Sequence, residues 1–394
     1  MKVVIAAAGT GGHINPGIAI ANKIKEEEPN SEIIFIGTGK QLEKDLVSRA
    51  GYKLETIDAY GFSKKINIEN IKKTIKTIKG FGTAKKILKA FKPDIVIGMG
   101  GYICGAVISA AHSLNIPTML HESNAYPGLA VRMLVKKTDT ILVGLEEAKK
   151  YLPKAKNVVY TGTPTKVKPL NITESQRLEI MYKTGFIHNM PLVLVFGGSQ
   201  GAKAINDAMV KLIVNKLNKN YQIIWAAGQG QYENVKEELK KNGMDIDRLN
   251  NVKVLPYIYN MDEIMGISDL VVARSGAMTL TELALLGKPA VFIPLPSSSA
   301  NRQEENSRVF EKNGAAKVIL NNELNENNLN ENINNIIENS ETLKSMGEAA
   351  KKMAVYDVED RIWKEITKLT KNKWIMSAVA HATAVKAERG LQNI

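Results

Sequence analysis

Cysteine is nearly absent from this chain, because Cys104 is the single one among 394 residues. One thiol excludes an internal disulfide framework and any zinc site built from cysteines, and it fits a reducing compartment. Long apolar runs are also missing. No stretch reaches the roughly 18 apolar residues of a spanning helix, and the apolar start, residues 1–8, is too short for a signal peptide. We therefore expect a protein that is cytosolic or binds a membrane only from the side.

Acidic side chains are fewer than basic ones: the chain has 40 Asp and Glu and 53 Lys and Arg, which gives a net charge of +13. This excess favours an anionic partner: nucleic acid, a phosphorylated small molecule or an anionic membrane surface. No recognised nucleic-acid-binding motif is present, so we expect no nucleic acid. The histidines show no ligand spacing, and the sole Asp-x-Asp, at Asp245 and Asp247, lies far from every glycine loop. We expect neither a metal nor a cofactor.

Short β-branched runs alternate with helical patterns, which predicts an α/β protein of parallel sheets covered by helices. The predicted strands are 2–7, 32–36, 53–57, 94–98, 117–120, 139–143, 157–160, 191–196, 222–226, 252–255, 269–273, 289–293 and 316–319. The pattern stops in a proline-containing segment after residue 160 and then restarts, which indicates two Rossmann-like domains facing across a cleft. Ligands are then expected at the carboxyl ends of the strands.

The expected domain limits follow from this break. The first domain covers 1–163, joined by a helix at 355–371, and the second covers 164–354; no role is assigned to the tail 372–394. The asparagine-rich segment 321–341 keeps apolar residues at helical spacing, so we expect a helix there.

The first strand leads into Gly9-Thr10-Gly11-Gly12-His13. Glycines let the backbone approach a ligand closely, and the following helix offers unpaired N–H groups to an anion. The dinucleotide fingerprint G-x-G-x-x-G is absent, and a plain tight turn is the alternative. An imidazole at the edge of such a loop suits a general base near neutral pH, which makes His13 a catalytic candidate.

The second half begins in the same way, with a strand that leads into Gly197-Gly198-Ser199-Gln200-Gly201. A third strand and turn, Arg274-Ser275-Gly276, precede a helical pattern that contains Glu282. A carboxylate there suits paired ribose hydroxyls, whereas the alternative is that the helix dipole favours Glu early in a helix. A long polar loop follows at 294–306, and His121-Glu122-Ser123-Asn124 follows a strand at the expected ligand edge.

Residues 64–92 carry ten lysines and one acid. Ile71, Ile75 and Ile78 have helical spacing, so a basic amphipathic helix is predicted that can lie on anionic lipid. The lysines among these isoleucines are Lys72, Lys73, Lys76 and Lys79. The alternative is a solvated lysine face over an ordinary core helix.

Six ordered motifs, over about residues 1–370, resemble the MurG family of bacterial peptidoglycan glycosyltransferases. They are Gly9 to Gly17, Gly98 to Tyr102, His121 to Asn124, Gly197 to Ala202, Arg274 to Glu282 and the loop at Arg302-Gln303. The resemblance implies the GT-B fold and an inverting transfer of N-acetylglucosamine from UDP-N-acetylglucosamine. The acceptor implied is the C4 hydroxyl of undecaprenyl-pyrophosphoryl-MurNAc-pentapeptide (lipid I), and the product is lipid II. The implied place is the cytoplasmic face of the cell membrane, with the protein bound peripherally.

The resemblance also implies site residues by position. Thr10, Gly11, Gly12 and Asn124 contact the donor. Ser199 and its loop meet the diphosphate, the backbone of Ile258 meets the uracil, and Gln303, assisted by Asn306, meets the sugar. The helix residues Ala277, Met278, Thr279, Leu280, Thr281 and Glu282 serve the diphosphate and ribose. Lys166 stands where the family often has an arginine near the nucleotide, which keeps the charge without the bidentate fork.

The chemistry needs one base and a way to stabilise the departing diphosphate. We expect His13 as the base, with Glu122 as the second candidate, and helix N-termini after Gly201 and Gly276 for the diphosphate. A UDP-N-acetylglucosamine 2-epimerase and a diacylglycerol glycosyltransferase are rival enzymes of the same fold. A lipid-surface binding module that uses only the lysine-rich segment is the rival outside enzymes.

Overall fold

The computed structural model describes residues 1–60, 68–186, 190–296 and 301–371, with backbone alone for 68–75. The chain forms two compact units. The first contains Met1–Ser123, Pro127–Lys166 and the segment that begins at Asp357, and the second contains Asn124–Tyr126 and Val167–Tyr356.

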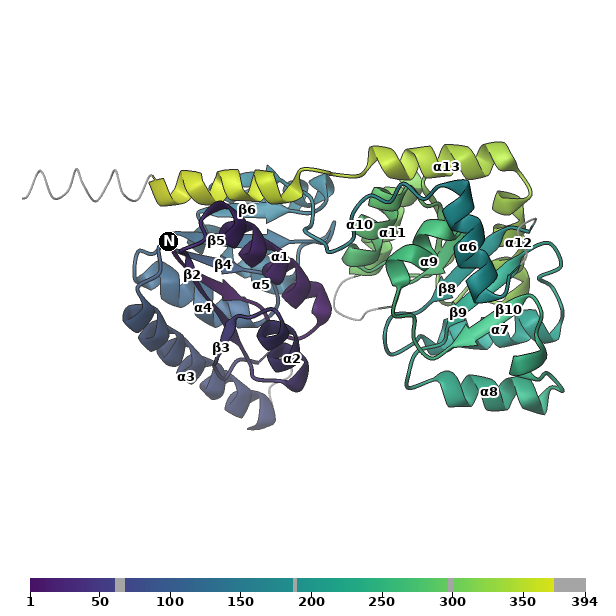
Figure 1. The fold of residues 1–394 in the computed structure, drawn as a ribbon. Helices are drawn as coiled ribbons and strands as arrows, with labels where there is room; N and C mark the ends of the chain where they lie inside the picture. The colour runs from purple at the N-terminus through teal and green to yellow at the C-terminus, as the bar shows by residue number, and fades with distance from the viewer. Residues whose placement is uncertain (61–67, 187–189, 297–300, 372–394) are drawn as a thin grey trace, which may run out of the picture. The chain divides into compact units, whose positions relative to one another are not determined.

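The first unit is a seven-stranded parallel sheet in the order β3-β2-β1-β4-β5-β6-β7 (Figure 1). Its strands are β1 Lys2–Ala6, β2 Glu32–Gly37, β3 Lys53–Thr56, β4 Ile95–Gly98, β5 Thr118–Glu122, β6 Thr140–Val143 and β7 Val158–Tyr160. Its helices are α1 Gly11–Glu27, α2 Gln41–Arg49, α3 Ile68–Phe91, α4 Ile103–Ser113 and α5 Leu129–Leu134, with 3₁₀ turns η1 Val135–Lys137 and η2 Glu146–Tyr151.

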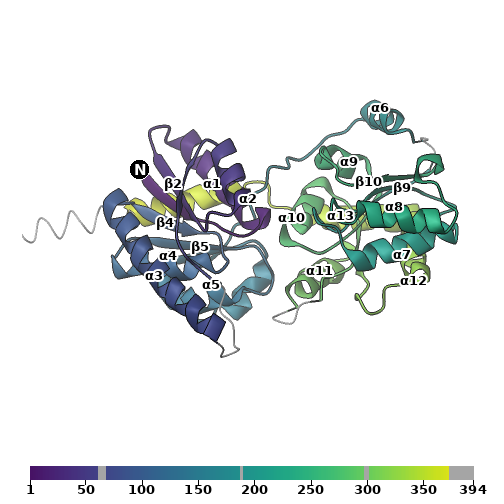
Figure 2. The same cartoon turned by 90° about the horizontal axis from the view of Figure 1, so that it is seen from below.

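Helices cover both faces of this sheet, which is why the inner strands β4 and β6 are buried throughout, whereas the edge strand β3 carries the exposed Lys53. Val4 and Ala6 of β1 face a core formed with α3, α4 and α5, which lie on the same side of the sheet (Figure 2). Ile5 faces the opposite side, where α1 packs so closely that an added Cβ at Gly17 would lie 3.2 Å from the Ile5 side chain.

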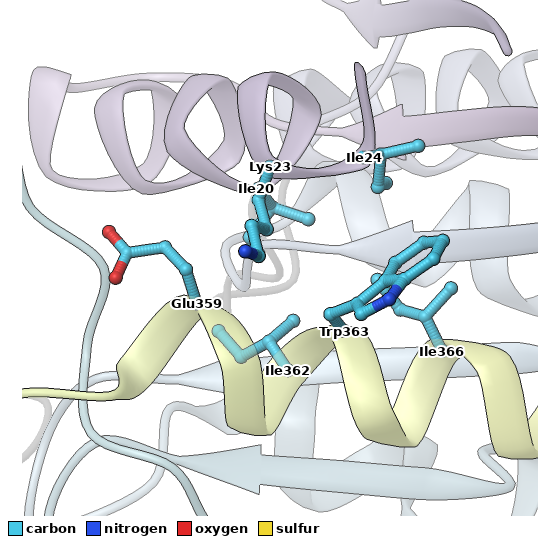
Figure 3. Close-up of a pocket in the computed structure, with 7 residues that line it drawn as sticks. All are labelled: Ile20, Lys23, Ile24, Glu359, Ile362, Trp363 and Ile366. Atoms are coloured by element: carbon cyan, nitrogen blue, oxygen red, sulfur yellow. The ribbon is translucent and has the colours of Figure 1, made fainter. Parts of the chain in front are cut away.

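A helix at 358–371 returns the end of the described chain to the first unit, where it packs on α1 (Figure 3). Ile362 and Ile366 are buried and lie with Ile20 and Ile24 of α1 around a small apolar gap. Lys23 Nζ lies 2.8 Å from the Asp360 carboxylate, which with Glu27 raises the pKa of Lys23 above its ordinary value. Apolar packing and this ion pair together hold the helix on α1.

The second unit is a six-stranded parallel sheet in the order β10-β9-β8-β11-β12-β13. Its strands are β8 Leu192–Phe196, β9 Gln222–Ala226, β10 Val252–Leu255, β11 Leu270–Ala273, β12 Ala290–Phe292 and β13 Ala316–Val318. Its helices are α6 Glu174–Thr184, α7 Lys203–Val214, α8 Tyr232–Lys241, α9 Met261–Ile267, α10 Ala277–Leu286, α11 Arg302–Lys312, α12 Glu326–Ile337 and α13 Ser340–Lys352, with the 3₁₀ turn η3 Ile246–Arg248.

The strand and helix predictions agree with the structure. Each of the thirteen predicted strands is present within two residues of its expected limits. The asparagine-rich segment forms α12, whose Leu329, Ile333 and Ile336 are buried in the core of the second unit. The lysine-rich segment forms α3. Among the described residues, no helix has both the length and the apolarity to cross a bilayer.

Candidate functional site

Each sheet has one point where the strand order reverses direction. In the first unit this point lies between β1 and β4, and in the second it lies between β8 and β11. At such a point the loops after the two neighbouring strands diverge to opposite faces, leaving a crevice at the carboxyl edge where α/β proteins bind ligands. The glycine loops at 9–12 and 197–201 follow β1 and β8, so both lie at these switch points.

The loop after β1 turns directly into α1. Gly9 has φ +97°, a conformation that favours glycine, and Thr10 is the N-cap residue. The Thr10 side chain makes no cap bond to α1, whose first turn holds no acid. Thr10 is exposed, and Gly11 and Gly12 are the first helical residues. The backbone N–H groups of this turn are therefore suited to an anionic or hydroxyl-rich ligand.

His13 lies where the loops after β1 and β4 meet. Its backbone N–H donates to Thr10 O at 3.0 Å, and its ring is half-buried. An added Cβ at Gly100 would stand 3.4 Å from the imidazole, and one at Gly101 would stand 3.8 Å from it. Both distances are ordinary van der Waals contacts, so the ring packs against this turn without requiring a missing Cβ. Glycine is favoured in the turn by its backbone, because Gly100 has φ +82° and Gly101 has φ +75°.

His121, at the end of β5, is buried and held on both ring nitrogens. Its Nε2 lies 3.0 Å from Gly162 O and its Nδ1 3.3 Å from Ser123 Oγ. Burial lowers the pKa of His121 to about 4, against the hydrogen bond to Gly162, which favours the protonated ring. His121 is thus a neutral group that ties β5 to the segment after β7.

Glu122 is also buried, and its carboxylate accepts a hydrogen bond from Gly128 N at 2.6 Å. Gly128 is the N-cap residue of α5, so this carboxylate lies at a helix N-terminus, where negative charge is stabilised. The contact gives Glu122 a structural task that the sequence did not indicate.

The loop after β8 is locked to the loop after β9. An added Cβ at Gly201 would overlap Ala227 O, and one at Gly228 would overlap the backbone of Gly201. Asn206 of α7 donates to Ala227 O at 2.9 Å and accepts from Trp225 Nε1 at 3.1 Å. Ser199 is exposed at the tip of this platform. Gly228 and Asn206 were not predicted as site residues, although two glycines directly after a strand, at 228 and 230, are typical of a turn in which backbone approaches backbone.

Two helices of the second unit begin at its switch point. α7 follows the loop at 197–201, and α10 follows Gly276. Their N-cap residues, Ala202 and Gly276, have no side chain that can cap, and neither helix has an acid in its first turn. Both first turns therefore offer N–H groups to a phosphate.

Within α10 the predicted residues differ in their surroundings. Ala277, Met278 and Thr279 form the half-buried first turn, whereas the Leu280 side chain is buried in the core. Thr281 Oγ1 donates to Ala277 O at 3.0 Å. Glu282 is the sixth helical residue, so it lies in the second turn, beyond the reach of the helix dipole that was the alternative reason for an acid there.

The described ends of the loop between β12 and α11 make polar contacts, while residues 297–300 of the predicted polar loop lie outside the described residues. Gln303 Oε1 accepts from Leu295 N at 2.9 Å, and Gln303 O accepts from Ser275 Oγ at 2.7 Å. Arg274 Nη1 donates to Ile293 O, Pro294 O and the Asn321 side chain. These bonds join the turn after β11 to the loop that was expected to meet the sugar.

Asn306 is wholly buried and engaged on both amide atoms. Its Nδ2 donates to Ser275 O and to Asn124 Oδ1, both at 3.1 Å, and its Oδ1 accepts from Ala125 N at 2.8 Å. The segment Asn124–Tyr126 belongs to the second unit. Asn306 therefore holds Asn124 in place from within the core of that unit.

Two predicted contacts lie outside the switch-point loops. Ile258 has a buried side chain between the exposed Tyr257 and Tyr259, so only its backbone is available to a ligand. Lys166 is exposed at the end of the first unit. No group of three or more His, Cys, Asp or Glu residues that could hold a metal ion occurs in the described parts of the chain.

The predicted membrane residues are described in part. The side chains of Ile71, Lys72, Lys73 and Ile75 lie outside the described residues. Ile78 is 66% exposed, Lys79 is exposed, and Lys76 Nζ lies 5.6 Å from the centre of the Tyr60 ring. A further pair of exposed apolar side chains, Leu129 and Met133 of α5, was not predicted from the sequence. The exposed basic residues Arg132, Lys136 and Lys137 lie near this pair in the chain.

Comparison with known proteins identifies relatives over nearly the whole chain. The glycosyltransferase family 28 N-terminal domain matches residues 3–143, and the family 28 C-terminal domain matches residues 192–362. The UDP-N-acetylglucosamine--N-acetylmuramyl-(pentapeptide) pyrophosphoryl-undecaprenol N-acetylglucosamine transferase of Ruminiclostridium cellulolyticum is 41% identical over 363 residues, 92% of this chain and 98% of that protein. Transferase 1 of the same name from Bacillus cereus is 38% identical over 371 residues, 94% of this chain and all of that protein.

Solved structures agree on the fold. The crystal structure of Acinetobacter baumannii MurG aligns with a TM-score of 0.73 at 26% identity, covering 93% of this chain and 100% of that one. The UDP-GlcNAc 2-epimerase of Neisseria meningitidis aligns with a TM-score of 0.66 at 16% identity, covering 93% and 100%. The second likeness bears on the fold alone. The predicted GT-B architecture is confirmed.

The buried His121 predicts a pH effect on stability. An unfolded histidine titrates near pH 6.5, and the folded one titrates at about 4. Between these values the unfolded chain binds a proton that the folded chain does not, so stability falls as pH falls, by at most about 1.4 kcal/mol per pH unit. We expect the difference in unfolding free energy between the parent and His121→Gln to shrink from pH 7 to pH 4 in urea titrations. His112→Gln, at an exposed position of α4, is the control. A pH-independent difference for His121→Gln would contradict the assignment.

Proposed function

The chain belongs to glycosyltransferase family 28, within the UDP-N-acetylglucosamine--N-acetylmuramyl-(pentapeptide) pyrophosphoryl-undecaprenol N-acetylglucosamine transferases, and on this premise we propose how its residues act. The reaction moves N-acetylglucosamine from UDP-N-acetylglucosamine to lipid I and gives lipid II. The observation that carries this function is identity of about 40% over more than nine-tenths of the chain to transferases of this one name. The 2-epimerases share the fold at sequence identities of 16% and 14%, and a likeness at that level supports a common fold but not a common activity.

His13 is the proposed general base that takes the proton of the acceptor hydroxyl. Its support is its place at the switch point of the first unit, on a loop whose glycines admit a ligand. An imidazole titrates near neutral pH, so its neutral form is available to accept a proton. Glu122 is the second candidate, and its bond to Gly128 N argues for a structural role first.

The second unit supplies the proposed donor site. The N–H groups at the starts of α7 and α10 stabilise the diphosphate charge that develops as UDP leaves, as preorganised dipoles do. Ser199 lies at the tip of the loop before α7, and Ala277, Met278 and Thr279 form the first turn of α10. Glu282 is the proposed ribose ligand and Gln303 the proposed sugar ligand. Ile258 acts through its backbone.

Three predicted residues take revised parts in this proposal. Asn306 is buried with both amide atoms engaged, so it positions Asn124 and the Ser275 turn without contacting the sugar. Leu280 and Thr281 serve through the α10 backbone, since one side chain is in the core and the other bonds to Ala277 O. Thr10, Gly11, Gly12 and Lys166 stay proposed donor contacts.

We further propose that the first unit, with its C-terminal helix, takes the acceptor at the cytoplasmic face of the membrane. α3 and α5 lie on one side of the sheet, and each presents exposed apolar residues among basic ones: Ile78 beside Lys79, and Leu129 and Met133 beside Arg132, Lys136 and Lys137. Such a surface suits anionic headgroups and the start of the acyl region. The acceptor is lipid-linked, so binding at this surface would bring the first unit to its substrate.

An assay of UDP release tests the function itself. UDP-N-acetylglucosamine is supplied with and without a soluble lipid I analogue, and we expect UDP release that depends on the analogue. A 2-epimerase would give an isomerised sugar nucleotide without any acceptor. A lipid-binding module would turn over nothing.

Removal of the imidazole tests the base. General-base catalysis contributes about 10²- to 10⁴-fold, so His13→Ala should lower kcat by about that factor while the KM for the donor changes little. Glu122→Gln, measured in the same way, is the matched variant. A loss below about tenfold in His13→Ala, with a larger loss in Glu122→Gln, would transfer the role to Glu122.

Charge removal on α3 tests the membrane surface. Each lysine near an anionic surface contributes about 1 kcal/mol, so replacing Lys72, Lys73, Lys76 and Lys79 with Gln should reduce cosedimentation with anionic vesicles and activity on vesicle-embedded acceptor. Activity on a short-chain soluble acceptor should persist. The control replaces Lys211, Lys216, Lys236 and Lys240, exposed lysines of the second unit, and removes the same charge. Equal cosedimentation of the α3 variant and the parent at physiological salt would refute this surface.

A further inference from the structure

Glu43 is a completely buried carboxylate in the first turn of α2. Its Oε1 accepts from Gly9 N at 3.0 Å and from Thr38 Oγ1 at 2.8 Å, and its Oε2 accepts from Thr38 N at 2.6 Å and Gly39 N at 2.9 Å. Buried acids are usually paired with a cation. Here four N–H and O–H donors from the backbone and Thr38 bond to the two carboxylate oxygens.

Three of these donors are local, and one is not. Thr38 and Gly39 belong to the turn that leads into α2, so their bonds resemble ordinary capping of a helix N-terminus. Gly9 belongs to the loop after β1, 34 residues earlier in the chain. The carboxylate therefore joins the loops that follow two neighbouring strands, β1 and β2.

The backbone around Glu43 is shaped to admit it. An added Cβ at Gly37 would stand 2.7 Å from Oε2, and Gly39 has φ +80°. Glycine at both positions leaves the space and the turn that bring the carboxylate against the loop after β1.

We propose that Glu43 is a positioning residue for transfer, which fixes the glycine loop at Gly9 and through it the first turn of α1 and His13. Its hydrogen bond to Gly9 N holds Gly9 in place, and Gly9, with φ +97°, is the residue at which the loop turns toward α1. The next residue, Thr10, then accepts the His13 N–H at 3.0 Å through its carbonyl. Glu43 is itself 0% exposed, so it acts on the reaction through this loop. The proposal rests on the proposed role of His13.

Glu43→Gln breaks the distant bond selectively. In the favoured orientation the Gln amide oxygen replaces Oε2 and still accepts from Thr38 N and Gly39 N. The NH₂ group then replaces Oε1. It can donate to the Thr38 hydroxyl, which rotates to accept, but it cannot bond to the Gly9 N–H, because both groups are donors. In the opposite orientation the NH₂ group would face the backbone N–H groups of Thr38 and Gly39, which leaves two buried donors without acceptors and costs more free energy. The variant therefore keeps the local bonds and loses the link to the loop.

Thr38→Val is the matched control, since it removes one local donor and leaves the bond between Gly9 and Glu43. We expect Glu43→Gln to lower kcat on the soluble acceptor at least tenfold, and Thr38→Val to stay within about twofold of the parent. Hydrogen exchange should become faster at residues 9–14 in Glu43→Gln and not in Thr38→Val. Parent-like kcat in Glu43→Gln, or equal losses in both variants, would overturn the proposal.

A double-mutant cycle separates this proposal from that for His13. If Glu43 acts through His13, adding Glu43→Gln to His13→Ala should lower kcat by less than about threefold more. The full tenfold loss in that background would show that Glu43 supports the fold at large and would overturn the proposal. A small effect of His13→Ala alone would count against His13 as the base, while exchange at residues 9–14 still decides whether Glu43 holds the loop. If Glu43→Gln does not fold, Glu43→Asp, which keeps the charge and shortens the reach to Gly9, is measured in its place.

Discussion

Backbone N–H groups at the helix starts beside the two switch points are the feature on which the rest of this architecture depends. α1, α7 and α10 each begin directly after a switch-point turn, their N-cap residues make no side-chain cap bond, and their first turns hold no acid. Other helices of the chain show both arrangements: Thr173 forms a capping box on α6 and Asn325 and Asn339 cap α12 and α13, whereas the N-cap residues of α4 and α5 make no side-chain cap bond. The place of α1, α7 and α10 after glycine-containing turns at the switch points, and not the missing cap alone, makes their N–H groups suited to an anionic ligand.

The glycines follow from this constraint. For N–H groups to converge on a ligand, the turns must bring backbone against backbone, and a Cβ would keep them apart. At Gly201 and Gly228 two such turns interlock, and at Gly100 and Gly101 a backbone with positive φ forms the turn against which His13 packs. Each of these loops is thereby in contact with the loop that follows a neighbouring strand.

Buried polar side chains complete the support. His121 and Asn306 hold loops or short segments from within the core, and each has polar partners on both sides of its ring or amide. In a low-dielectric interior such fully bonded groups specify one arrangement, whereas a broken bond there is costly. We therefore expect the geometry of the site to depend on residues that never contact substrate, as proposed for Glu43.

The sequence by itself determined the order and limits of the strands and the two Rossmann-like sheets, because a strand covered on both faces must be apolar throughout and glycine marks its turns. It also located the glycine loops and His13, because those residues are consecutive in the chain. Only the tertiary structure decided which polar residues hold the loops. Glu43 lies 34 residues from Gly9 and Asn306 lies 182 from Asn124, and neither carries a local pattern that reveals its partner. Helical spacing predicts that a face exists, but not what covers it, so Leu129 and Met133 became visible as an exposed pair only once α5 was packed on the sheet.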